Sequence, residues 1–141
     1  MTDSVPKSRI VELQNNSCAV EKFCQRLLKE AADLGFAKDR LFGIHLALEE
    51  AFTNAVEHGN GGDPDKKVQV EYLITPNLFD ITISDQGNGF APENVPDPRA
   101  DENLFKQGGR GLLLMNAYMD AVEYNDEGNK VRMVKHNAEV N

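Results

Sequence analysis

The chain has 141 residues, enough for one domain with a buried core that needs no disulfide or structural metal. Hydrophobic residues are 40% and charged residues 27% of the chain, as in globular rather than disordered proteins, and the net charge of −8 argues against nucleic-acid binding. No apolar run approaches the roughly 20 residues of a membrane span, and the first residues lack a signal-peptide pattern, so the sequence predicts a cytoplasmic protein.

The first half of the sequence predicts one strand and two helices. Residues 8–14 are typical of a strand. From Ser17, a suitable N-cap, apolar residues recur with the spacing of one buried helical face, and Gly35 is a suitable C-cap. A second helix is expected over 38–58, where a cluster of glycines and a proline ends it.

Two cysteines lie in the first predicted helix. Cys18 and Cys24 are six positions apart, and neither a CxxC motif nor a Cys/His zinc spacing surrounds them. This excludes the common redox and zinc motifs. We therefore expect two reduced thiols that are part of the core.

The second half predicts mainly strands. Alternating apolar residues or turn signals place strands at residues 68–74, 79–84, 121–124 and 131–135. A loop of about twenty residues, 87–109, and a short helix, 112–119, separate the second of these strands from the third. Helices grouped early and strands grouped late predict an α+β fold, a two-layer α/β sandwich with a mostly antiparallel sheet in a single domain, 1–141.

The second predicted helix has a face that differs from its core stripe. At about 100° per residue, Gly43, Ala47, Glu50, Asn54 and Glu57 fall together on this face. Small residues permit close approach to the backbone, and a carboxylate and a carboxamide one turn apart are able to hold a ligand. For this pattern alone, a solvated polar stripe is the alternative.

Two glycine-containing segments follow. Asp85-Gln86-Gly87-Asn88-Gly89 comes directly after a predicted strand, where an aspartate can accept a hydrogen bond from an exocyclic amine and glycines permit close ligand approach. Gly108-Gly109-Arg110-Gly111 precedes the short helix, whose free N–H groups suit phosphate, with Lys106 and Arg110 adding positive charge. Each segment alone also fits an ordinary turn or helix start, and no Walker-type loop is present.

Together and in this order, the three segments resemble the nucleotide site of the GHKL (histidine-kinase-like) ATPases, over about residues 41–120. Glu50-Ala51-Phe52-Thr53-Asn54-Ala55-Val56-Glu57-His58-Gly59 and Gly109-Arg110-Gly111-Leu112-Leu113-Leu114-Met115 resemble the motifs of bacterial anti-sigma factor serine kinases. The resemblance implies the GHKL fold, with a lid loop at about 90–108.

The same resemblance implies roles for individual residues. Glu50 would be the general base that takes the proton from the attacking hydroxyl, and Asn54 would coordinate the Mg²⁺ that bridges the ATP phosphates. Asp85 would recognise the adenine amino group. Further ATP contacts are implied at Gly87, Gly89, Lys106, Gly109, Arg110, Gly111 and Leu112.

The implied activity is that of an ATP-dependent protein serine/threonine kinase. Its family phosphorylates a STAS-domain anti-anti-sigma protein, sequesters a sigma factor and commonly forms homodimers. Two alternatives stay open: an ATP-binding regulatory module that holds a partner without transfer, and a histidine-kinase-like ATPase subunit of a phosphorelay. Glu50 argues against the first, and the lack of a histidine placed as a phosphoacceptor argues against the second.

Overall fold

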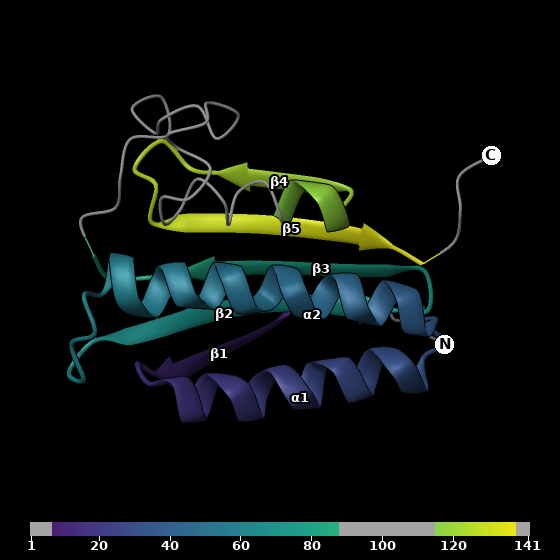
Figure 1. Cartoon of the computed structure of the whole chain (residues 1–141), viewed down its shortest axis with the longest axis horizontal. Coiled ribbons are helices and arrows are strands. Elements are labelled where there is room, and N and C mark those ends of the chain that lie inside the picture. Colours follow the sequence, from purple (N-terminus) through teal and green to yellow (C-terminus); the bar gives the residue numbers. More distant parts are fainter. Residues whose placement is uncertain (1–6, 88–114, 138–141) are drawn as a thin grey trace.

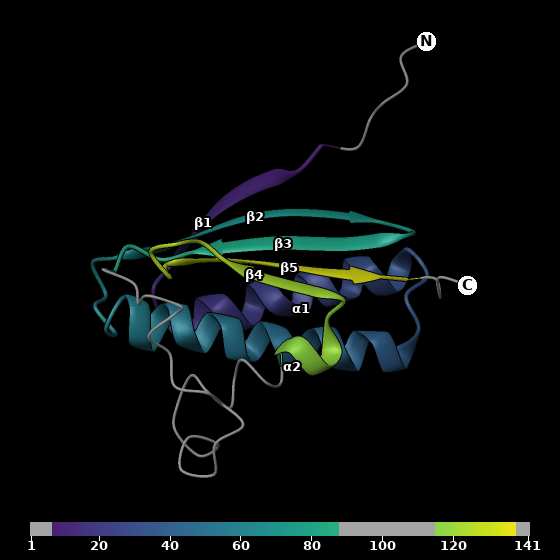
Figure 2. The ribbon, with the colours of Figure 1, turned by 90° about the horizontal axis from the view of Figure 1, so that it is seen from above.

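The computed structural model describes residues 7–87 and 115–137, which form one sheet with helices packed on a single face (Figure 1; Figure 2). In chain order the elements are β1 (Arg9–Gln14), α1 (Ser17–Asp33), α2 (Lys38–Thr53), the π-helix η1 (Asn54–Gly59), β2 (Lys67–Thr75), β3 (Leu78–Ser84), β4 (Ala121–Tyr124) and β5 (Lys130–His136). Residues 115–118 are helical and precede β4. The predicted α+β fold of two layers is confirmed.

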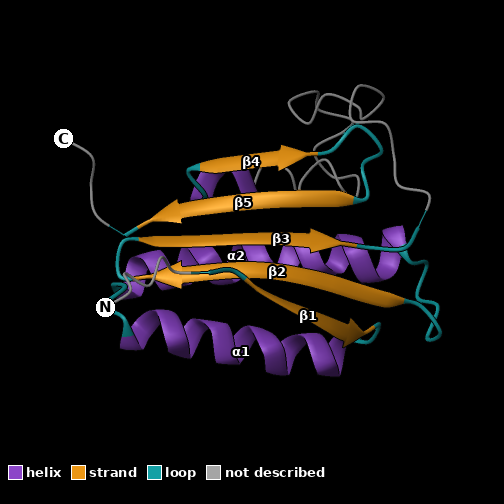
Figure 3. Ribbon diagram, turned by 180° about the vertical axis from the view of Figure 1, so that it is seen from behind, coloured by secondary structure: helices purple, strands orange, loops and turns teal. Residues whose placement is uncertain are grey.

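The five strands of the described part follow the order β1-β2-β3-β5-β4, and every neighbouring pair is antiparallel (Figure 3). The hairpin of β2 and β3 turns at Pro76 and Asn77, between the paired Thr75 and Leu78. After the helical residues 115–118, the chain forms the outer strand β4 and returns as β5 beside β3. The end of β3 therefore lies beside the start of β5, although the two are far apart in the sequence.

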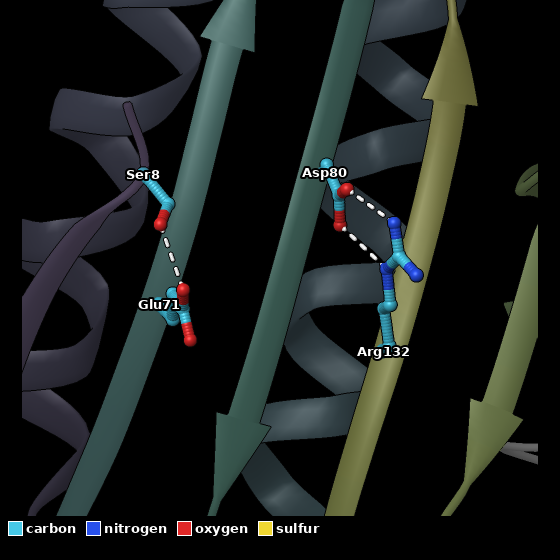
Figure 4. Close-up of polar contacts among 4 residues, drawn as sticks. All are labelled: Ser8, Glu71, Asp80 and Arg132. Atoms are coloured by element: carbon cyan, nitrogen blue, oxygen red, sulfur yellow. Dashed lines mark hydrogen bonds and ion pairs between the residues drawn. The ribbon is translucent and has the colours of Figure 1, made fainter. Parts of the chain in front are cut away.

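The two faces of the sheet differ in polarity, as expected for an antiparallel sheet covered on one side. Buried side chains of the core face alternate along β2 and β3 with more exposed ones, which confirms the predicted strand pattern. The other face carries polar pairs: Arg132 donates to both carboxylate oxygens of Asp80 at 3.1 and 2.7 Å, and Ser8 donates to Glu71 at 2.7 Å (Figure 4).

The N-cap of helix α1 lies one residue earlier than predicted. The N-cap is Asn16, whose side chain accepts a hydrogen bond from the Ala19 N–H at 2.8 Å, so the prediction of Ser17 was wrong. Cys24 is in the core, where burial raises the pKa of its thiol to about 12. Cys18 is exposed, which corrects the prediction of two core thiols: six residues turn a helix to faces about 120° apart. Neither cysteine forms a disulfide.

The second predicted helix is not α-helical throughout. Helix α2 ends at Thr53, and the chain continues as the π-helix η1 to Gly59, with the Asn60 N–H bonded to the Ala55 carbonyl at 2.8 Å. The wheel of about 100° per residue therefore does not hold beyond α2, where it had placed Glu57, which is exposed. Within the described ranges, no helix has the length and apolar character to cross a membrane.

Candidate nucleotide site

The candidate site lies where η1 and the end of β3 meet. Gly59 closes η1, and Asp85 and Gly87 come directly after β3. A Cβ atom added at Gly59 would overlap the Asp85 carboxyl group, and one added at Gly87 would overlap the Gly59 carbonyl. The two segments are thus packed without room for a methyl group at either glycine. The structure brings together the helix motif and the first glycine segment, as the resemblance implied.

Asp85 is held on its backbone and on its side chain. Its N–H donates to the Asn129 carbonyl at 2.9 Å, which continues the pairing of β3 with β5, and its Oδ1 accepts from the Gly87 N–H at 2.9 Å. Burial raises the pKa of Asp85, and the Gly87 hydrogen bond and the charge of Lys66 only partly oppose this effect. A carboxylate with little competing water is a strong acceptor for a ligand amine.

Asn54 and Asp85 share a neighbour, Tyr124 at the end of β4. Burial raises the pKa of Tyr124 and the charge of Asp85 raises it further, while a hydrogen bond from the Asn54 side chain opposes both. These interactions place Asn54, Asp85 and Tyr124 in one cluster. Sequence reasoning missed Tyr124, because nothing in a short edge strand distinguishes its last residue.

Glu50 lies one turn before Asn54 and is half-buried. The Asn54 N–H still reaches the Glu50 carbonyl, so the spacing between these two residues is α-helical and the π-helix starts after it. The small half of this helix face has a different function from the polar half. Gly43 lies against the ring of Tyr118, so it makes room for the helical residues 115–118, and Ala47 is fully buried.

Gly59 also has a role that its position in the sequence did not show. The sequence predicted only that Gly59 helps to end a helix. Its φ is not positive, so the missing side chain provides space and does not serve an unusual backbone conformation. The predicted lid loop at 90–108 lies outside the described residues. So do the remaining predicted ATP contacts, which are Gly89, Lys106, Gly109, Arg110, Gly111 and Leu112.

Comparison with known proteins identifies relatives that match most of the chain. The histidine kinase-like ATPase domain family matches residues 13–135. The serine-protein kinase RsbW of Listeria monocytogenes is 34% identical over 113 residues, which cover 75% of this chain and 72% of that protein. The anti-sigma F factor of Anoxybacillus flavithermus is 34% identical over 114 residues, 74% of this chain and 75% of that protein.

The fold is also found in a solved structure. The RsbU and RsbW domains of Rv1364c from Mycobacterium tuberculosis match 92% of this chain with a TM-score of 0.60 and 16% sequence identity. The chain spans 31% of the length of that protein. At this identity the match shows a shared fold, with helices on one face of an antiparallel sheet.

Proposed function

The chain belongs to the histidine kinase-like ATPase family, within its branch of anti-sigma serine-protein kinases, and from this premise we propose how it acts. It transfers the γ-phosphate of ATP to a serine or threonine of a STAS-domain anti-anti-sigma protein. In its other role it binds and sequesters a sigma factor. Phosphorylation releases the STAS-domain partner, whereas the unphosphorylated partner displaces the sigma factor. The protein works as a homodimer.

The observation that carries the proposal is the place of the Asp85 carboxylate. It lies against Gly59 and Gly87 at positions where no side chain would fit, so the two glycines allow the carboxylate to be held at this one place. Asp85 accepts the hydrogen bond of the adenine amino group. Burial of this carboxylate strengthens such a bond, because little water competes with the ligand.

The residues also fit a magnesium ion bound together with ATP. The Asn54 carboxamide oxygen is a hard ligand of the kind that Mg²⁺ prefers. Asn54 would hold the ion together with the bound ATP. The described residues contain no group of three or more His, Cys, Asp or Glu side chains able to hold a metal. When bound, Mg²⁺ offsets the charge of the phosphates.

Glu50 acts on the other reactant. Its carboxylate accepts the proton of the substrate hydroxyl as the hydroxyl oxygen forms a bond to the γ-phosphorus, and the bond from that phosphorus to the β,γ-bridging oxygen breaks to release ADP. Glu50 lies one helical turn before Asn54, on the same side of the helix, which supports these two roles. The contacts at Gly89, Lys106, Gly109, Arg110, Gly111 and Leu112 stay predictions from the sequence.

A transfer assay tests this proposal. Purified protein, Mg²⁺ and γ-labelled ATP are incubated with the STAS-domain proteins of the same genome. We expect label on a serine or threonine of one of them, lowered by about 10²–10⁴-fold in Glu50→Gln, which keeps the shape of the side chain but removes the base. ATP affinity, measured by calorimetry, should change little in this variant.

Glu49→Gln is the matched control, because it changes the neighbouring exposed carboxylate and should transfer phosphate normally. Transfer that survives in Glu50→Gln would exclude Glu50 as the base. ATP binding without transfer to any STAS-domain protein would favour a regulatory module that holds its partner and does not phosphorylate it.

A further inference from the structure

Two asparagines are buried next to the candidate site. Asn15 and Asn60 are 4% and 1% exposed, and they are the buried polar residues of the described part of the chain. Asn60 Nδ2 donates to Asn15 Oδ1 at 3.0 Å, and Asn15 Nδ2 donates to the Asp63 carbonyl at 2.9 Å. The pair joins the residue after β1 to the segment that leaves η1. Buried amides are costly unless they are fully paired, so this network needs a specific partner at each atom.

The remaining bonds of Asn60 complete the sheet where its backbone pairing stops. The ladder between β2 and β3 ends at Gln69 and Ser84, and the same register, continued, would set Lys67 opposite Gln86. Asn60 fills this place: its Oδ1 accepts from the Gln86 N–H at 2.7 Å, and its Nδ2 donates to the Lys67 carbonyl at 3.0 Å. The Gln86 side chain in turn accepts from the Lys67 N–H at 2.7 Å. Side-chain amides thus replace direct backbone bonds.

This substitution affects Asp85, which directly precedes Gln86. A carboxamide between two strands holds them farther apart than a direct hydrogen bond does. On its other side, the Asp85 N–H remains paired with the Asn129 carbonyl of the β4–β5 turn. The backbone around Asp85 is therefore fixed by β5 on one side and by Asn60 on the other, and its side chain is directed against Gly59.

We propose that Asn60 is a positioning residue for adenine recognition: by holding the Gln86 N–H and the Lys67 carbonyl at once, it fixes the Asp85 carboxylate where the amino group of the base is bound. This inference rests on the proposed function of Asp85. An amide suits the place because it donates and accepts at the same time. Leucine has a similar volume and does neither, whereas aspartate keeps the acceptor for Gln86.

The test compares two nucleotides that differ only in the amino group that Asp85 reads. ATP and purine riboside triphosphate, which lacks that group, are titrated by calorimetry with Mg²⁺ into the wild type, Asp85→Ala, Asn60→Leu and the double variant. We expect the wild type to prefer ATP by about 10–100-fold, as for a hydrogen bond to a charged group. Asn60→Leu should lose most of this preference, and it should add nothing in the Asp85→Ala background.

Three further variants separate positioning from stability. Asn15→Leu removes a buried amide that does not contact Gln86, so it should lower Tm but keep the preference. Asn60→Asp keeps the acceptor for the Gln86 N–H but loses the donor to the Lys67 carbonyl, so it should lose part of the preference. Gln86→Ala changes an exposed side chain, is expected to fold even if Asn60→Leu does not, and should reduce the preference by several-fold, because it frees the Lys67 N–H.

The outcomes distinguish this inference from the function on which it rests. A wild type without preference for ATP would overturn the adenine role of Asp85 itself. A preference that depends on Asp85 but survives in Asn60→Leu and Gln86→Ala would overturn only the role of Asn60. The same holds if these variants weaken both nucleotides equally, or if Asn15→Leu loses the preference as fully as Asn60→Leu.

Discussion

The two long helices lie side by side under the sheet but end in different ways (Figure 2). Helix α1 ends in a Schellman motif: the Gly35 N–H bonds to the Ala32 carbonyl at 3.0 Å and the Phe36 N–H to the Ala31 carbonyl at 3.1 Å. Gly35 has a φ of 103°, which a residue with a side chain rarely adopts. Phe36 is buried beyond it, so this end connects and packs the helix.

Helix α2 instead continues directly into the wider π-helix η1. Single π-turns inside helices are found frequently at functional sites. Here the wider turn carries the chain from Asn54 to Gly59, beside Asp85. The comparison shows that a glycine at a helix end has two distinct physical uses. At Gly35 the requirement is a backbone conformation, and at Gly59 it is space for another side chain.

Exchange of Gly35 or Gly59 for alanine should give the largest difference in ATP affinity between the two helix ends. Gly59→Ala forces the Asp85 carboxyl group to move; overpacking typically costs about 1–3 kcal/mol, and the displaced acceptor adds to the loss. We expect ATP affinity to fall by at least ~100-fold. Gly35→Ala meets no atom but is strained at its φ, so it should cost about 1–2 kcal/mol of stability and leave ATP affinity within ~2-fold.

Calorimetric titration with ATP and thermal unfolding of both variants provide these measurements. The comparison fails if Gly59→Ala binds ATP as tightly as the wild type, or if Gly35→Ala is the variant that loses binding.

Asp85→Asn should sharpen the comparison at the η1 end, because it is expected to change ATP affinity and stability in opposite directions. Burial raises the pKa of Asp85 in the folded state, so the ionised carboxylate destabilises the fold at pH values above that pKa. The variant should therefore show a higher Tm than the wild type at pH 7 without nucleotide, while its ATP affinity falls by about 10–100-fold.

The sign of this effect is checked by its pH dependence. At pH values well below about 3.9, Asp85 is protonated both in the unfolded and in the folded state, so the Tm advantage of Asp85→Asn should shrink as the pH falls from 7 through this range. An advantage that grows on acidification would mean that the carboxylate stabilises the fold instead.

The smallest expected effect concerns the second buried face of α2, which α1 lacks. A Cβ at Gly43 would lie 3.1 Å from Cδ1 and 3.2 Å from Cβ of Tyr118. Alanine gains about 1 kcal/mol of helix propensity over glycine, but this contact offsets it. We expect Gly43→Ala to destabilise the wild type by about 1 kcal/mol in urea unfolding, and to destabilise Tyr118→Ala less, because that variant lacks Cδ1 but keeps Cβ. Equal effects in both backgrounds would show that Tyr118 does not limit this position.

The core could largely be predicted from the sequence, because it depends on local periodicity. Alternation along β2 and β3 and the helical spacing from Val20 to Ala31 identified which side chains are buried. The π-helix could not be predicted in this way, since residues 54–59 would also suit an α-helix and their conformation depends on what packs against them. Cys18 was misassigned for a related reason: its type is that of a core residue, but its helix face is not.

The sequence by itself predicted the kind of site, because the helix motif with Glu50 and Asn54 and the turn with Asp85 together resemble the nucleotide site of the GHKL ATPases. Only the tertiary structure decided which atoms meet. Gly59 faces Asp85 and Asn60 bonds to Gln86 across 26 positions of sequence, and Tyr124 joins them from the far edge of the sheet. Such contacts arise from strand order and register, which depend on the packing of the whole domain and leave no local pattern in the chain.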